Sequence, residues 1–205
     1  MLQDIAGFAI VAGLLTMVPG IDTAQVLRAA TLGGPTRAYA TLVGIMAGVL
    51  IWGAAAALGI SALLVASRTA YDILRFAGAA YLLYLGVRII VNSRHPSTDS
   101  LTLERTWRLI PTFTRALLIT LTNPKNGLFY VAMLPQFLPT GLPAFAGGVL
   151  LAAVHALECL LWFSMLIWST HRARVFLQRP RVQVWTERVS GAALVGFGLR
   201  VVAER

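Results

Sequence analysis

The feature that most constrains the fold is a set of long apolar segments, three within residues 5–92 and three within residues 112–205. Stretches of about 20 apolar residues are long enough to cross the hydrocarbon core of a bilayer. Charged residues make up only 12% of the chain, against about 25% in soluble domains, and they gather between these segments. The sequence therefore predicts an all-α polytopic membrane protein, in which residues 1–205 form one transmembrane domain with six helices.

The six predicted spans divide into two repeats of three helices. Repeat 1 covers about residues 1–92, repeat 2 covers about residues 112–205, and a polar cytoplasmic loop at 93–111 separates them. Similar sequences at 75–90 and 187–202 support a duplication. Because three is an odd number, the two copies are expected to insert with inverted topology. The expected spans are Ile5–Leu32, Thr36–Val65, Tyr71–Val91, Thr112–Leu138, Ala144–Ser169 and Val184–Ala203.

The arginines predict the orientation in the membrane. Twelve of them follow the first, third and fifth spans, and four lie on the other side. The positive-inside rule then places the twelve in the cytoplasm and both termini outside it, in a multi-pass protein of the inner membrane. The net charge of +9 is interpreted as contact with anionic lipid headgroups. No nucleic-acid partner is expected, because the arginines lie in short loops and form no basic domain.

Small residues on the second predicted span indicate close helix packing. Gly44 and Gly48 form a GxxxG pattern, which lets two helix backbones approach each other. The pattern favours packing within the chain. A seam between two copies, and therefore a homo-oligomer, stays open as the alternative.

The first predicted span is broken at Pro19 and Gly20. Proline in a helix interior removes a hydrogen bond and costs about 3 kcal/mol. The helix is expected to restart with Asp22 as its N-cap and Gln25 three residues on, an acidic variant of the capping box, and to end at Gly33. The break would thus leave the N-terminus of a short half-helix, with its unpaired N–H groups and positive dipole end, inside the membrane.

The fourth predicted span repeats this design. Asn123 is a good N-cap, Pro124 suits the first helical position, and Asn126 follows three residues after the cap. If the halves are inverted, the two half-helix N-termini can meet near the midplane. Such termini bind carboxylates, and Lys125 adds a positive charge beside one of them while Asp22 supplies the opposite charge. We therefore interpret Asp22, Asn123, Lys125 and Asn126 as a substrate-binding set that suits a zwitterion.

A structural explanation for these residues stays open. Proline kinks are common in membrane helices, and Asp22 with Lys125 could form an ion pair with a purely structural role. A charge at the centre of a span costs about 2.5–3.5 kcal/mol on insertion scales. A partner or a cavity is therefore expected for Lys125.

The fifth predicted span carries His155, Glu158 and Trp162 on one helical face, at positions i, i+3 and i+7. Glu158 and His155 could form a proton relay for coupling. A mutually satisfied polar pair that holds helices together is the equal alternative. No metal site or cofactor is expected, because His155, Glu158 and Asp22 match no known ligand spacing and Cys159 is the lone cysteine.

Taken together, these motifs resemble the lysine exporter family (LysE/RhtB), also described as LysE-type translocators, which export amino acids. The resemblance rests on the Pro-Gly-x-Asp, Asn-Pro-Lys and His/acid/Trp patterns, on Gly78–Gly86 with Tyr81, and on Pro135–Phe137. It covers nearly the whole chain. The family usually has a second proline where this chain has Ile21. The resemblance implies efflux driven by a proton gradient or the membrane potential.

The favoured hypothesis is a secondary-active exporter of amino acids or related small zwitterions. A metal-ion transporter of related architecture is one alternative, and it would need several acidic or histidine ligands facing one cavity. A membrane-embedded enzyme is another, although the chain has no HExxH or GxSxG motif and no catalytic residue is assigned.

Overall fold

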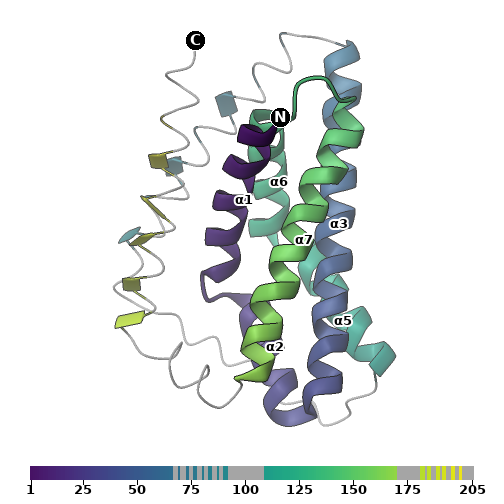
Figure 1. Ribbon diagram of the computed structural model, residues 1–205, viewed down its shortest axis with the longest axis vertical. Coiled ribbons are helices and arrows are strands. Elements are labelled where there is room, and N and C mark those ends of the chain that lie inside the picture. Colours follow the sequence, from purple (N-terminus) through teal and green to yellow (C-terminus); the bar gives the residue numbers. More distant parts are fainter. Residues whose placement is uncertain are drawn as a thin grey trace.

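The computed structural model is all-helical in the residues that it describes, which are 1–66, 109–169 and single positions within 69–91 and 181–199 (Figure 1). The predicted all-α class is therefore confirmed for this part of the chain. The expected spans Tyr71–Val91 and Val184–Ala203 lie outside the continuously described ranges. The helices are α1 (Leu2–Met17), α2 (Ile21–Gly33), α3 (Pro35–Ala66), α5 (Leu109–Thr122), α6 (Pro124–Phe137) and α7 (Ala144–Trp168).

Two of the described helices are each long and apolar enough to cross a membrane. They are α7 and the part of α3 at Pro35–Ile60. α1 and α2 form a third candidate if they count as one span, bent by 56° at the break between them. At 1.5 Å per residue, the 25 residues of α7 extend about 38 Å, beyond the roughly 30 Å of a hydrocarbon core. The full six-span count stays a prediction.

The turn from α2 into α3 depends on one glycine. Gly34 has a φ of 78°, in the left-handed region that side chains with a Cβ rarely adopt. Pro35 then opens α3 at a position where its missing N–H needs no partner. The carbonyl of Gly34 accepts from the Ala38 N–H at 3.1 Å and closes the first turn of α3. α2 therefore ends at Gly33, as the sequence predicted.

α3 packs closely on two neighbouring helices through its small residues. A Cβ at Gly48 would lie 2.7 Å from the Thr120 methyl of α5, and Gly44 approaches the α5 backbone in the same way. On another face of α3, Gly53 meets Ala152 of α7. The GxxxG pattern is thus used for packing within the chain.

The two broken spans run in opposite directions in Figure 1. α1 descends from the N-terminus into α2, whereas α5 ascends into α6. Both breaks lie at mid-height in this view. α2 begins at one and α6 at the other, and the two helices point away from each other. These directions are those expected of inverted repeats, although the complete pair of three-helix units stays a prediction.

An aromatic cluster joins α1 and α6. Phe8 packs against Phe129 and Phe137 with ring centroids 5.8 and 6.2 Å apart, and Phe129 packs edge-on against Tyr130.

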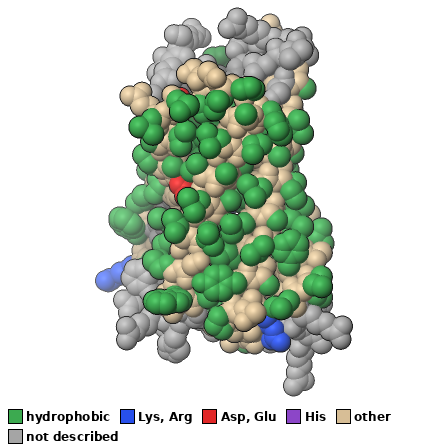
Figure 2. Space-filling model, turned by 45° about the vertical axis from the view of Figure 1, so that its right-hand side comes forward, with side chains coloured by type: hydrophobic (Ala, Val, Ile, Leu, Met, Phe, Trp, Pro, Cys, Tyr) green, Lys and Arg blue, Asp and Glu red, His purple; other side chains and the backbone are tan. Residues whose placement is uncertain are grey.

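The outer surface is also apolar. Figure 2 shows hydrophobic side chains over most of one face, with Lys and Arg visible only in its lower part. Such a surface suits contact with lipid.

Candidate functional site

The first break is organised around a carbonyl that Pro19 leaves without its helical donor. α1 ends at Met17 and α2 begins at Ile21. In a continuous helix the Leu15 carbonyl would accept from the N–H of residue 19, but proline has none. The Lys125 ammonium donates to this carbonyl at 3.2 Å instead. Its positive charge also suits the C-terminal end of a helix dipole.

The second break follows the same logic. The Thr120 carbonyl lies four residues before Pro124 and loses its usual donor. It accepts from the indole Nε1 of Trp52 at 3.3 Å and from the Asn123 N–H at 3.4 Å. Asn123 is the N-cap of α6, as predicted, because its side chain accepts from the Lys125 N–H at 3.1 Å. In each break, a side chain from another helix donates to the carbonyl that proline frees.

Asp22 is not the N-cap of α2, which corrects the sequence-based prediction. The N-cap is Gly20, with φ −152° and ψ −163°, and no side chain caps the helix. The first turn closes when the Ala24 N–H donates to the Gly20 carbonyl at 2.9 Å, so the helix starts two residues earlier than the capping-box pattern implied. Because glycine has no side-chain acceptor, the first N–H groups of α2 are left without a cap.

The two half-helix starts therefore differ, although the sequence predicted that both would be available to an anion. The start of α6 is occupied by its own Asn123 side chain, whereas the start of α2 has no side-chain acceptor. Only the start of α2 offers N–H groups that an external carboxylate could accept from.

The Asp22 carboxylate instead joins the two breaks. It accepts from Asn126 Nδ2 at 3.2 Å, from Thr120 Oγ1 at 3.4 Å, and from Gln25 Nε2 within its own helix at 3.4 Å. Gln25, Thr120 and Asn126 are all buried. These three donors are neutral, so the opposite charge that acts on the carboxylate is that of Lys125 in the same pocket.

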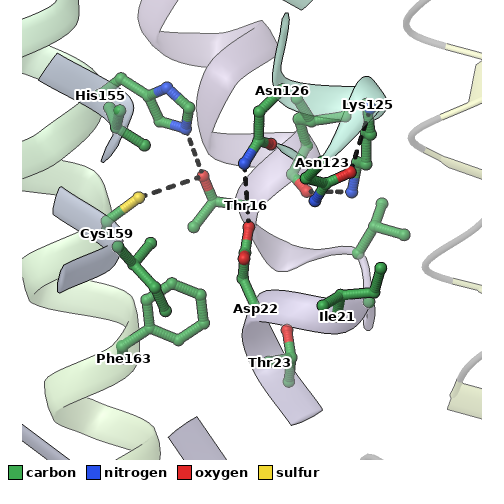
Figure 3. Close-up of a pocket in the computed structure, with 15 residues that line it drawn as sticks. Thr16, Ile21, Asp22, Thr23, Asn123, Lys125, Asn126, His155, Cys159 and Phe163 are labelled. Carbon is green, nitrogen blue, oxygen red and sulfur yellow. Dashed lines mark hydrogen bonds between the residues drawn. The ribbon is translucent and has the colours of Figure 1, made fainter. Parts of the chain in front are cut away.

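The predicted substrate-binding residues surround one pocket. Asp22, Asn123, Lys125 and Asn126 all line it, and Figure 3 shows Asp22 directed toward Asn126 between α2 and α6. The cavity has a volume of about 30 Å³. Pro19 and Pro124 create the two breaks, and Gly20 lines the pocket beside them. The apolar side of the pocket consists of Leu15, Val18, Ile21, Ile45, Val49 and Phe163.

His155 holds three helices together at the edge of this pocket. Thr16 Oγ1 of α1 donates to the Ala12 carbonyl at 2.8 Å, so its only proton is used and it accepts from His155 Nε2 at 3.1 Å. His155 Nδ1 is then an acceptor for the Tyr130 hydroxyl of α6, 3.0 Å away. These bonds suit a neutral imidazole and join α7 to α1 and α6. The described hydrogen bonds do not connect His155 to Glu158.

Glu158 has a different environment, on the side of α7 that meets α1. A Cβ built on Gly13 would lie 3.5 Å from Glu158 Oε1. The other oxygen, Oε2, is buried without a hydrogen-bond partner in the described structure, and so is Trp162 Nε1 one turn further on. An unpartnered carboxyl oxygen at this depth is costly, which is typical of functional residues in membrane helices.

Several residues of this site had no sequence-based assignment. Thr16, Thr120 and Tyr130 each lie in an apolar span and carry one hydroxyl, which is too common a pattern to single out. Trp52 offered a weak signal, because an indole N–H in mid-span needs a partner. Within the described residues, no three His, Cys, Asp or Glu side chains gather as a metal site would require. The metal-ion alternative therefore gains no support from this part of the chain.

A family model covers both breaks of the chain. The family model for the LysE type translocator matches residues 14–205. An uncharacterized membrane protein of Pseudomonas aeruginosa is 32% identical over 192 residues, which are 90% of this chain and 88% of that protein. The homoserine/homoserine lactone efflux protein of Salmonella typhi is 26% identical over 94% of this chain and 92% of its own length.

A leucine efflux protein of Salmonella choleraesuis is 33% identical over 132 residues, 63% of this chain and 60% of that protein. No solved structure gives a significant match.

Proposed function

This chain belongs to the LysE type translocator family, a family of transporters and not of enzymes, and on that premise we propose that it is a secondary-active exporter of amino acids or related small zwitterions across the inner membrane. Two of its relatives are named for efflux of leucine and of homoserine and its lactone. These names make neutral amino acids the first substrates to test.

One observation carries the proposal: both helix breaks meet in a single pocket that holds opposite charges beside an uncapped helix start. A substrate carboxylate would accept from the free N–H groups at the start of α2 and from Lys125. A Cβ on Gly20 would lie 3.8 Å from Lys125 Nζ, so this ammonium is next to those N–H groups. The substrate ammonium would approach Asp22, whose hydrogen-bond donors are all neutral.

The apolar part of the pocket supports a substrate with an uncharged side chain. Ile45, Val49 and Phe163 offer no partner for a second charge, and burying an unpaired charge is costly. The present cavity of about 30 Å³ accommodates only about two waters, because one needs about 10–15 Å³. The site must therefore widen to admit an amino acid, as an alternating-access cycle requires.

Three of the described arginines support a cytoplasmic location for the α2–α3 turn. Arg28 lies in α2, Arg37 in the first turn of α3 and Arg115 in α5, at the end of the bundle opposite the N-terminus (Figure 1). By the positive-inside rule, the N-terminus is then outside the cytoplasm. An odd number of spans in each repeat would bring the C-terminus to the same side.

For the coupling, we assign the proton to Glu158 and a positioning role to His155. The buried, unpartnered Oε2 of Glu158 supports the first assignment. The two hydroxyl partners of His155 support the second, because both ring nitrogens are already used. Efflux would then depend on the proton gradient through a carboxyl group separate from the residues that line the pocket.

Efflux from reconstituted vesicles tests the substrate site. Radiolabelled L-leucine and L-homoserine serve as probes, with Asp22→Asn and Lys125→Met as variants and Asp4→Asn as the matched control. Asp4 carries the same charge but pairs with the N-terminal amine at 2.8 Å, far from the pocket. We expect both site variants to lose efflux while reaching the membrane, and the control to retain it. Normal transport by the double variant would make the charged pair structural, and no efflux of any amino acid by the wild type would refute the exporter assignment.

A further inference from the structure

Trp52 contacts the second helix break from α3 but does not line the pocket. Its indole N–H donates to the Thr120 carbonyl at 3.3 Å. This carbonyl has lost its helical donor because residue 124 is proline. The backbone alternative, from Asn123, is longer at 3.4 Å. Since an unsatisfied carbonyl inside a membrane protein is costly, the indole replaces the helical donor that Pro124 lacks and adds to the longer bond from Asn123.

The same indole ring also contacts the far side of the break. A Cβ on Gly127 would lie 2.6 Å from Trp52 Cη2 and 2.7 Å from Cζ2, closer than real Cβ atoms approach another side chain. Glycine at 127 is therefore what allows the ring to lie against α6. Trp52 thus contacts Thr120 on one side of Pro124 and Gly127 on the other. These two contacts fix the position of the segment between them.

The segment held in this way carries the groups directed at Asp22. Thr120 Oγ1 and Asn126 Nδ2 reach the carboxylate at 3.4 and 3.2 Å, near the upper limit for hydrogen bonds. A shift of the break by a few tenths of an ångström would disrupt them. We propose that Trp52 is a positioning residue for the substrate site, which acts through Thr120 and Asn126 without touching substrate. The proposal rests on the assignment of this pocket as the substrate site.

The first experiment removes the indole N–H. Trp52→Phe keeps an aromatic ring, and incorporation of 3-benzothienylalanine at 52 keeps nearly the full ring shape but replaces N–H with sulfur. Trp168→Phe is the matched control, because Trp168 is 92% exposed at the end of α7. Half-saturation for L-leucine efflux should rise about threefold to tenfold in both Trp52 variants, the range that one hydrogen bond is worth. The control should leave it unchanged.

A second readout does not depend on transport. Cys159 is the chain's single cysteine, is buried and lines the same pocket. Its labelling by N-ethylmaleimide in vesicles should become several-fold faster in the Trp52 variants, because loosening the break opens the pocket. If no amino acid is transported even by the wild type, the exporter assignment fails, yet the labelling rates still decide the role of Trp52.

A size exchange provides the rescue test. Gly127→Ala should impair efflux and speed Cys159 labelling, since the new methyl meets the indole. Combining it with Trp52→Phe should restore both readouts part of the way toward the wild type, because the smaller ring vacates the place of Cη2 and Cζ2. Unchanged half-saturation and labelling in the benzothienylalanine variant would overturn the proposal. So would a double variant no better than Gly127→Ala alone.

Discussion

Replacing Gly20 with serine tests whether the start of α2 binds the substrate carboxylate. Gly20 is the N-cap of α2 in an extended conformation, and no side chain caps the helix. Serine adopts this conformation readily and is a preferred N-cap. Its Cβ would lie 3.8 Å from both Lys125 Nζ and the Val18 carbonyl, which is ordinary contact. The substitution should therefore fold without strain.

The expected effects on stability and on transport have opposite signs. A serine cap stabilises a helix by only a few tenths of a kcal/mol relative to glycine, so thermal unfolding should be unchanged or slightly higher. The serine hydroxyl, however, would accept from the N–H of Asp22 or Thr23 and occupy the donors that a carboxylate needs. Hydrogen bonds to a charged group contribute about 1.5–3 kcal/mol, which corresponds to about 10- to 150-fold in affinity.

The assay is half-saturation of leucine efflux in vesicles, compared among wild type, Gly20→Ser and Gly20→Ala. Alanine adds the Cβ but no acceptor, so it controls for the space that the side chain takes. We expect a large rise in half-saturation with serine and a small one with alanine, although alanine, as a poor N-cap, should be the less stable of the two variants. Equal half-saturation in all three proteins would refute the assignment of the carboxylate to the start of α2.

The remaining predictions concern coupling, packing and topology. Glu158→Gln should lose uphill efflux but keep exchange of labelled for unlabelled leucine, and normal uphill efflux would exclude this carboxyl as the proton carrier. Tyr130→Phe leaves the buried Nδ1 of His155 without its donor and should lower stability by about 1–3 kcal/mol, measured as thermal unfolding in detergent; unchanged stability would contradict the described bond. In a cysteine-free background, Thr36→Cys should react with an impermeant thiol reagent only from the cytoplasm and Gln3→Cys only from outside, and the reverse pattern would invert the orientation.

The helices were predictable from sequence because lipid imposes a strong length and composition rule. The spans expected at Ile5–Leu32 and Thr36–Val65 correspond to Leu2–Gly33, interrupted at the break, and Pro35–Ala66. The end of α2 was also predictable, since glycine followed by proline stops one helix and starts the next. The start of α2 was not. Asp22 and Gln25 have the spacing of a capping box, but the backbone begins its helix at Ile21.

Asp22 illustrates why local patterns fail at a site. A carboxylate at the second position of a helix can accept from the backbone of its own helix or from donors on another helix. A local sequence pattern does not show which donors another helix will bring close. In this fold Asn126 and Thr120 lie within reach, so the side chain leaves its own helix. The same competition separates His155 from Glu158, because Thr16 and Tyr130 occupy both nitrogens of the imidazole.

The carbonyls at the breaks mark the boundary between what sequence can and cannot predict. Any proline in a helix leaves the carbonyl four residues earlier without a donor, so Leu15 and Thr120 follow directly from Pro19 and Pro124. The side chains that supply the missing donors do not, because Lys125 and Trp52 lie 110 and 68 residues away from their acceptors. Donors of this kind depend on the tertiary fold, and here they join each break to a different helix. A shift of either break must therefore displace the donor side chain or break its hydrogen bond. In this way the pocket is linked to the helices that surround it.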